Sequence, residues 1–157
     1  MENRKDKAFL KSPLGVLRLS HILLDALVWI TIASRRYEGA VHFAVFVAVL
    51  FWLTALALFI CTLLGKSELV PCLGAERWLL TNTWHDGLAT LGHLVACGVM
   101  VYKTKEKNFC NVTAYSFSCL YSLYLTATVF LALCAFLYLL SAIYSAYKAS
   151  QGHTSLF

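Results

Sequence analysis

Long apolar runs alternate with short polar segments along almost the whole chain. Four of these runs are long enough to be membrane spans, and they cover residues 14–34, 41–64, 79–102 and 121–147. A helix of about 20 apolar residues crosses a hydrocarbon core of about 30 Å, and each run reaches that length. We therefore predict an all-α integral membrane protein in which four transmembrane helices form one bundle over residues 14–147, between tails at 1–13 and 148–157.

The composition supports the membrane class. Hydrophobic residues make up 60% of the chain and its mean hydropathy is +0.70, whereas soluble domains are about 45–50% apolar. Pro13 and Pro71 are the only prolines, and both fall outside the predicted spans. The first run exceeds the apolar core of a signal peptide, which is about 7–15 residues. We therefore expect it to be retained as a span, and cleavage after it is the alternative.

The positive charges indicate how the chain is oriented in the membrane. Four spans place both tails and the loop 65–78 on one side. Outside the spans, seven Lys and Arg residues lie on that side and five lie on the other. The positive-inside rule therefore favours cytoplasmic termini. The basic N-terminal tail lacks the stripe of basic and aromatic residues that binds nucleic acid, so we expect it to lie against anionic lipid, with no nucleic-acid partner.

The loop before the fourth span carries two cysteines that agree with this orientation. Cys110 and Cys119 flank the sequon that begins at Asn111. A disulfide and an N-glycan both require the lumenal or extracellular side of the membrane. We predict a Cys110–Cys119 disulfide and a candidate glycosylation site at Asn111. The alternative is two free thiols beside a chance sequon.

The other four cysteines suggest different roles. Cys61 and Cys72 lie near or in the predicted cytoplasmic loop, where they are candidates for palmitoylation. Cys97 and Cys134 lie within spans. There we expect them to act as small apolar packing residues.

Charged side chains inside the predicted spans need partners, because each costs about 2.5–3.5 kcal/mol in hydrocarbon even on insertion scales. Arg18 and Asp25 lie seven residues apart on one face of the first span, as do Asp86 and His93 on the third. A rise of about 1.5 Å per residue places Arg18 and Asp86 in the same leaflet, and Asp25 and His93 near the middle of the bilayer. We therefore predict two intramembrane polar pairs, Arg18–Asp86 and Asp25–His93. Extension of Arg18 to the lipid headgroups is an alternative.

Few residues suggest cofactor or catalytic chemistry. His21 and His93 are the only histidines placed to hold a haem between spans, and no cofactor motif accompanies them, so we expect no cofactor. The Gly65-Lys66-Ser67 triplet resembles the end of a phosphate-binding loop, but Ile60 occupies the position of the first glycine. We find no catalytic triad, metal-ligand spacing or nucleophile elbow, and expect no enzymatic activity.

The chain resembles a MARVEL domain over nearly its whole length. The resemblance rests on segment 9–74, the short first outer loop 35–40, the His85-Asp86 pair, the cysteines of the third loop and segment 138–142. Claudin-like four-span proteins differ, because their first outer loop is long and carries a W…C…C signature. The resemblance implies an M-shaped four-helix protein with cytosolic tails, associated with membrane trafficking, membrane apposition and cholesterol-rich domains.

We predict a non-enzymatic protein that organises membrane domains or takes part in vesicle trafficking and membrane apposition, at the plasma membrane or in vesicles. Its expected partners are the lipid bilayer, including cholesterol-rich regions, other membrane proteins and further copies of itself. Small residues recur four apart in several spans, which lets membrane helices approach closely. The alternative is a small transporter or channel subunit that uses Arg18, Asp25, Asp86 and His93.

Overall fold

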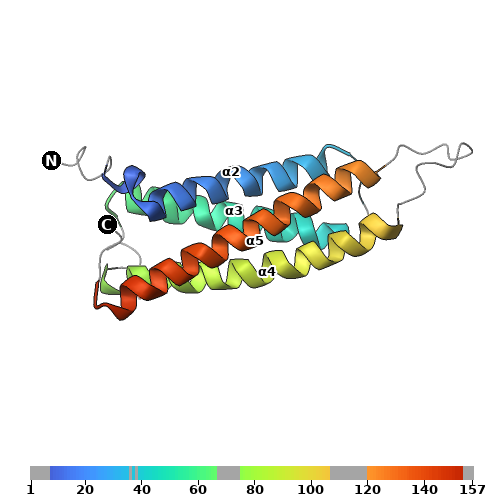
Figure 1. Ribbon diagram of the computed structural model, residues 1–157. Helices are drawn as coiled ribbons and strands as arrows, with labels where there is room; N and C mark the ends of the chain where they lie inside the picture. Colours follow the sequence, from blue (N-terminus) through green and yellow to red (C-terminus); the bar gives the residue numbers. More distant parts are fainter. Residues whose placement is uncertain (1–7, 36, 38, 67–74, 107–119, 154–157) are drawn as a thin grey trace, which may run out of the picture.

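Four long helices form one antiparallel bundle in a computed structural model, which describes residues 8–35, 37, 39–66, 75–106 and 120–153 (Figure 1). The helices are α2 (Pro13–Ala33), α3 (Val41–Leu63), α4 (Trp78–Glu106) and α5 (Tyr121–Ser150). A short 3-10 turn, η2 (Ala75–Arg77), leads directly into α4. The first residues of α2 and the last residues of α5 lie at the same end of the bundle (Figure 1).

The helices are arranged as a ring of four. Helix α2 packs against α3 and α5, and helix α4 packs against the same two neighbours, with α4 and α5 sharing the most extensive interface. Consecutive helices are therefore adjacent, and α5 closes the ring against α2. Helices α2 and α4 lie on opposite sides of the ring, so side chains that join them must cross its interior.

The helix boundaries differ slightly from the predicted spans. Helix α2 begins at Pro13, a first-turn position that suits proline because its φ is already helical and its missing N–H is not needed. Ser12 caps this turn, since its Oγ accepts a hydrogen bond from the Gly15 backbone N–H at 3.1 Å. Helices α4 and α5 continue to Glu106 and Ser150, beyond residues 102 and 147. Both extensions consist largely of polar residues that follow the apolar runs.

Helices α2, α3 and α5 have the length and apolar composition of membrane spans. The predicted span 79–102 lies within α4, which is less apolar by composition than the other three helices. Four of its polar residues, Asn82, Asp86, Thr90 and His93, are buried within the bundle. The lower hydropathy of α4 therefore arises in part from the side that faces the other helices.

The bundle has polar residues in its interior and large apolar residues on its surface. Leu23, Phe46, Leu91 and Ile143, one from each helix, are 59%, 60%, 63% and 58% exposed. Monomeric soluble proteins rarely expose contiguous apolar patches larger than a few hundred Å². A surface of this kind is suited to lipid. The described core combines apolar side chains, among them Tyr124 and Met100, with buried polar side chains.

Candidate functional site

Polar side chains follow one face of three helices and meet in the interior of the bundle. They recur at spacings of three, four or seven residues, which keeps them on one side of each helix. They are Arg18, His21 and Asp25 on α2, Asn82, Asp86 and His93 on α4, and Cys134, Tyr138 and Ser141 on α5. All of them are buried. Apart from His21, they form two clusters, one centred on Asp86 and one on Asp25.

The Asp86 cluster contains a paired arginine and carboxylate. Arg18 Nη1 donates to Asp86 Oδ1 at 2.7 Å, and Arg18 Nη2 donates to Asp86 Oδ2 at 3.3 Å. Arg18 Nη2 also donates to Asn82 Oδ1 at 2.6 Å. Two-pronged pairing of this kind fixes geometry and is among the stronger polar contacts in proteins. The pair joins α2 to α4 across the ring.

Further hydrogen bonds tie the Asp86 carboxylate to the two remaining helices. His85 Nδ1 lies 2.9 Å from Asp86 Oδ1, and His85 Nε2 lies 2.8 Å from Thr54 Oγ1 on α3. The Ser141 hydroxyl on α5 donates to Asp86 Oδ2. The cluster therefore connects all four helices, and it surrounds each buried charge with partners.

The Asp25 cluster lies farther along the bundle. His93 Nε2 is 2.8 Å from Asp25 Oδ1, and the Tyr138 hydroxyl donates to Asp25 Oδ2 at 2.7 Å. His93 Nδ1 donates to the Ala89 carbonyl at 2.7 Å. Since a carbonyl only accepts, Nδ1 carries a proton, and the contact between His93 Nε2 and Asp25 requires one more proton shared between them. The His93–Asp25 pair therefore carries no net charge.

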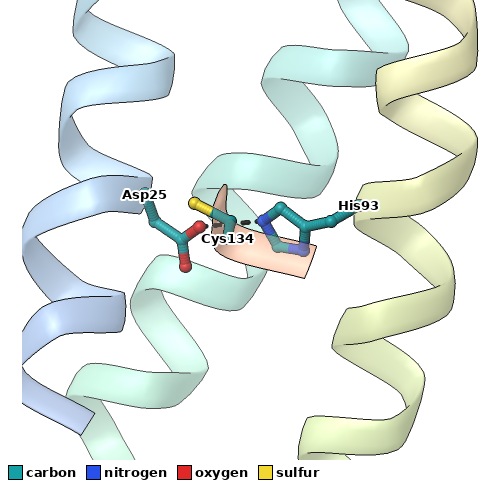
Figure 2. Close-up of side chains that lie close together, drawn as sticks. All are labelled: Asp25, His93 and Cys134. Atoms are coloured by element: carbon teal, nitrogen blue, oxygen red, sulfur yellow. Dashed lines mark hydrogen bonds and ion pairs between the residues drawn. The ribbon is translucent and has the colours of Figure 1, made fainter. Parts of the chain in front are cut away.

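Cys134 completes the Asp25 cluster. Its Sγ, a carboxylate oxygen of Asp25 and a ring nitrogen of His93 all lie within 4.8 Å of one another, and all three residues are buried. Figure 2 shows the three side chains gathered in the bundle interior, from α2, α4 and α5. A carboxylate, an imidazole and a thiol at this separation can share protons or hold a metal ion.

The structure thus brings together both residue pairs that helical spacing and depth suggested, Arg18 with Asp86 and Asp25 with His93. Arg18 is 3% exposed and its guanidinium points to Asp86. This orientation differs from the alternative, in which the Arg18 side chain extends to the lipid headgroups.

His21 lies between the two clusters along α2. Its ring stacks on Tyr138 with centroids 3.9 Å apart, and the ring of His93 is 5.1 Å from the same tyrosine. Neither ring nitrogen of His21 makes a hydrogen bond of normal geometry to a described residue, although the Leu137 backbone is nearby. Tyr138 therefore contacts both histidines that the haem hypothesis requires, and fills space that a haem between them would need.

Several members of the clusters were not predicted as partners of the charged residues. Cys134 was expected only to fill space, yet it lies beside Asp25 and His93. Tyr138 and Ser141 entered the sequence analysis only through the family resemblance. The sequence does contain a pattern that could have predicted their role. Cys134, Tyr138 and Ser141 recur four and three residues apart, so they form one polar stripe along the last span.

Four predicted site residues lie outside the described part of the chain, namely Cys110, Cys119, Asn111 and Cys72. Cys61 is half-buried near the end of α3 and forms no disulfide. It packs against an apolar cluster that includes Phe9 and Trp78.

Comparison with known proteins gives matches along most of the chain. The model of the MARVEL family, described as a membrane-associating domain, matches residues 9–144. MARVEL domain-containing protein 1 of Danio rerio is 51% identical over 155 residues, which covers 99% of this chain and 96% of that protein. The protein of the same name from Xenopus laevis is 30% identical over 119 residues, 71% of this chain and 68% of the relative.

Plasmolipin from Danio rerio is also similar, at 31% identity over 93 residues that cover 58% of this chain and 52% of the relative. No solved structure matches the chain.

Proposed function

The chain belongs to the MARVEL family of membrane-associating domains, and from this membership we propose a four-span protein that organises membrane domains or vesicle traffic without enzymatic activity. We place it in the plasma membrane or in vesicles, with both termini in the cytoplasm. Its proposed partners are the bilayer, cholesterol-rich lipid, other membrane proteins and further copies of itself.

The proposal of a fourth span is supported by the outward face of α4. Between Leu80 and Tyr102, every exposed residue of this helix is apolar, aromatic or glycine. Exposed charged residues occur only beyond these limits, at Glu76 and Arg77 before the helix and at Lys105 and Glu106 at its end. A stretch of this length covers about 33 Å at about 1.5 Å per residue, enough to cross a hydrocarbon core of about 30 Å. The outward face of α4 is thus apolar like those of the other three helices, which supports the proposal that it also crosses the membrane.

The proposal of an organising role, and not a transport role, is carried by the sealed polar interior. A transporter or channel needs its charged groups to reach water at some stage of its cycle. Here Arg18 is 3% exposed, Asp25, Asp86 and His93 are 0% exposed, and each has a partner from another helix. Such contacts hold the helices together. Within the described bundle, the surface left for recognition is the outer, apolar one, which suits lateral contacts with lipid and with other membrane helices.

The cysteine assignments extend this proposal to the edges of the bundle. A Cys110–Cys119 disulfide would fix the entry of the chain into α5 on the outer side, and Asn111 would carry a glycan there. Palmitoylation at Cys61 or Cys72 would strengthen attachment to ordered lipid on the cytoplasmic side. Intact mass with and without reductant, and after hydroxylamine, separates these modifications from unmodified residues.

Proximity labelling tests the proposed role. A labelling enzyme fused to the C-terminal tail is expected to mark integral membrane proteins of the plasma membrane or vesicles, and cholesterol depletion is expected to change that set. The matched control is the same enzyme on an unrelated single-span anchor sorted to the same membrane. Neighbours identical to those of the control, with no response to cholesterol, would contradict an organising role. Flux in proteoliposomes that disappears in Asp25→Asn would favour the transporter alternative.

A further inference from the structure

We propose that Asp25, His93 and Cys134 form a binding site for a divalent metal ion of the zinc type in the interior of the bundle. This site is independent of the proposed organising role, and it goes beyond the sequence analysis, which found no metal-ligand spacing. One ligand atom from each residue lies within 4.8 Å of the other two, and the residues come from α2, α4 and α5 (Figure 2).

The donor set selects the class of ion. Zinc binds carboxylate oxygen, imidazole nitrogen and thiolate sulfur, whereas magnesium and calcium prefer oxygen ligands alone. Zinc–ligand bonds of about 2.0–2.3 Å in a tetrahedron place the ligand atoms about 3.3–3.8 Å apart. The Asp25 Oδ1 and His93 Nε2 atoms are now 2.8 Å apart through a hydrogen bond. They would need to separate by less than about 1 Å, a change that side-chain rotation can supply.

Hydrogen bonds behind the ligands orient them toward a common point. The His93 Nδ1–H group donates to the Ala89 carbonyl at 2.7 Å, which leaves Nε2 directed at Asp25 and Cys134. The Tyr138 hydroxyl donates to Asp25 Oδ2 at 2.7 Å, which leaves Oδ1 directed at His93. Supporting contacts of this type accompany most histidine and carboxylate ligands of metals. The arrangement therefore has the outer shell of a metal site as well as its ligands.

The charge balance suits an apolar environment. Without metal, Asp25 and His93 share one proton and Cys134 is a thiol, so the group is neutral. A divalent ion would bond to Asp25 Oδ1, His93 Nε2 and Cys134 Sγ and release two protons, the shared one and the thiol proton. The product contains one carboxylate, one thiolate and a doubly charged ion, and is again neutral. Because neither the metal-free nor the metal-bound group carries a net charge, burial in hydrocarbon opposes neither of them strongly.

Three protein ligands leave one of the four zinc positions for a water molecule or for the second Asp25 oxygen. Asp25, His93 and Cys134 are each 0% exposed, so the ion must enter as the helices assemble. We therefore expect zinc to leave the folded protein slowly when a chelator is added.

Metal analysis of purified protein tests this site. The chain is produced in zinc-containing medium with a tag that lacks histidines, purified in mild detergent, and its zinc measured by mass spectrometry. We expect about one zinc per chain, and a loss of at least about tenfold in bound zinc in Cys134→Ser. The matched control is Cys97→Ser, since Cys97 lies one turn from His93 on α4, where its Sγ is 3.8 Å from the Thr128 carbonyl. It should retain the full content.

Cobalt substitution gives a second measurement. It uses the wild-type protein, so it does not require that a variant lacking a ligand still folds. Protein made with cobalt in place of zinc should show the near-ultraviolet charge-transfer band of a cobalt–thiolate bond, and the Cys97→Ser protein should show it unchanged. Wild-type protein without bound zinc or cobalt would overturn the proposal. So would zinc retained equally in Cys134→Ser and His93→Gln, or bound cobalt without the thiolate band.

Discussion

Replacing either Arg18 or Asp86 by leucine is expected to lower the free energy of unfolding by about 3–5 kcal/mol, because each change leaves the other charge buried without its partner. The pair is two-pronged and nearly inaccessible, with the shorter contact at 2.7 Å. Hydrogen bonds between membrane helices contribute only about 0.6 kcal/mol on average. An effect of several kcal/mol would therefore identify a stranded charge, and not merely a lost hydrogen bond.

The double change Arg18→Leu with Asp86→Leu is expected to destabilise the protein less than the sum of the single changes. Unfolding in detergent or bicelles, followed for the four proteins of the cycle, measures this coupling. The control is Arg35→Leu, since Arg35 is an exposed arginine just beyond α2 and should have little effect. Single effects that simply add would show that the two residues are not coupled.

Replacing His93 by leucine in zinc-free protein is expected to destabilise the bundle by about 3–5 kcal/mol. The change removes the group that shares a proton with Asp25, so the carboxylate must either stay charged without a cation or take up a proton. Tyr138→Phe removes only the 2.7 Å hydrogen bond to Asp25 Oδ2. It should cost about 0.6–2 kcal/mol, the range of hydrogen bonds between membrane helices.

The same unfolding measurement tests this order of effects. The double change Asp25→Leu with His93→Leu should recover much of the stability lost in His93→Leu, because the carboxylate that lost its partner is then absent as well. His42→Leu is the control, since His42 is exposed at the start of α3. A Tyr138→Phe protein as unstable as His93→Leu would contradict this order, because the tyrosine hydroxyl would then matter to the Asp25 carboxylate as much as the histidine does.

Much of the polar interior could be predicted because depth and helical spacing are properties of single helices. The seven-residue separations of Arg18 from Asp25 and of Asp86 from His93 place each pair on one face. Because the chain reverses direction twice between α2 and α4, these two helices run in the same direction, and residues at similar depths on them can meet. Both arguments need only the helix rise and the start of each span.

The remaining contacts depend on how the helices are rotated against one another, which spacing within one helix does not determine. Cys134 looked like a packing residue because a single cysteine in a span usually is one. Its neighbours Asp25 and His93 come from two other helices. Ser141 reaches Asp86 for the same reason, through the close interface of α4 and α5. The span in α4 was predicted like the others, although its buried polar residues make this helix less apolar than the other three.

We propose that α4 crosses the bilayer with its polar face turned inward. Cysteine labelling tests this topology, in a chain in which every native cysteine except the buried Cys134 is replaced by serine. Glu76→Cys and Lys105→Cys place single thiols at exposed positions at the two ends of the helix. A membrane-impermeant maleimide should label Lys105→Cys in intact cells, and Glu76→Cys only after permeabilisation. Labelling of both thiols from the same side would contradict a fourth span, and the reverse pattern would contradict cytoplasmic termini.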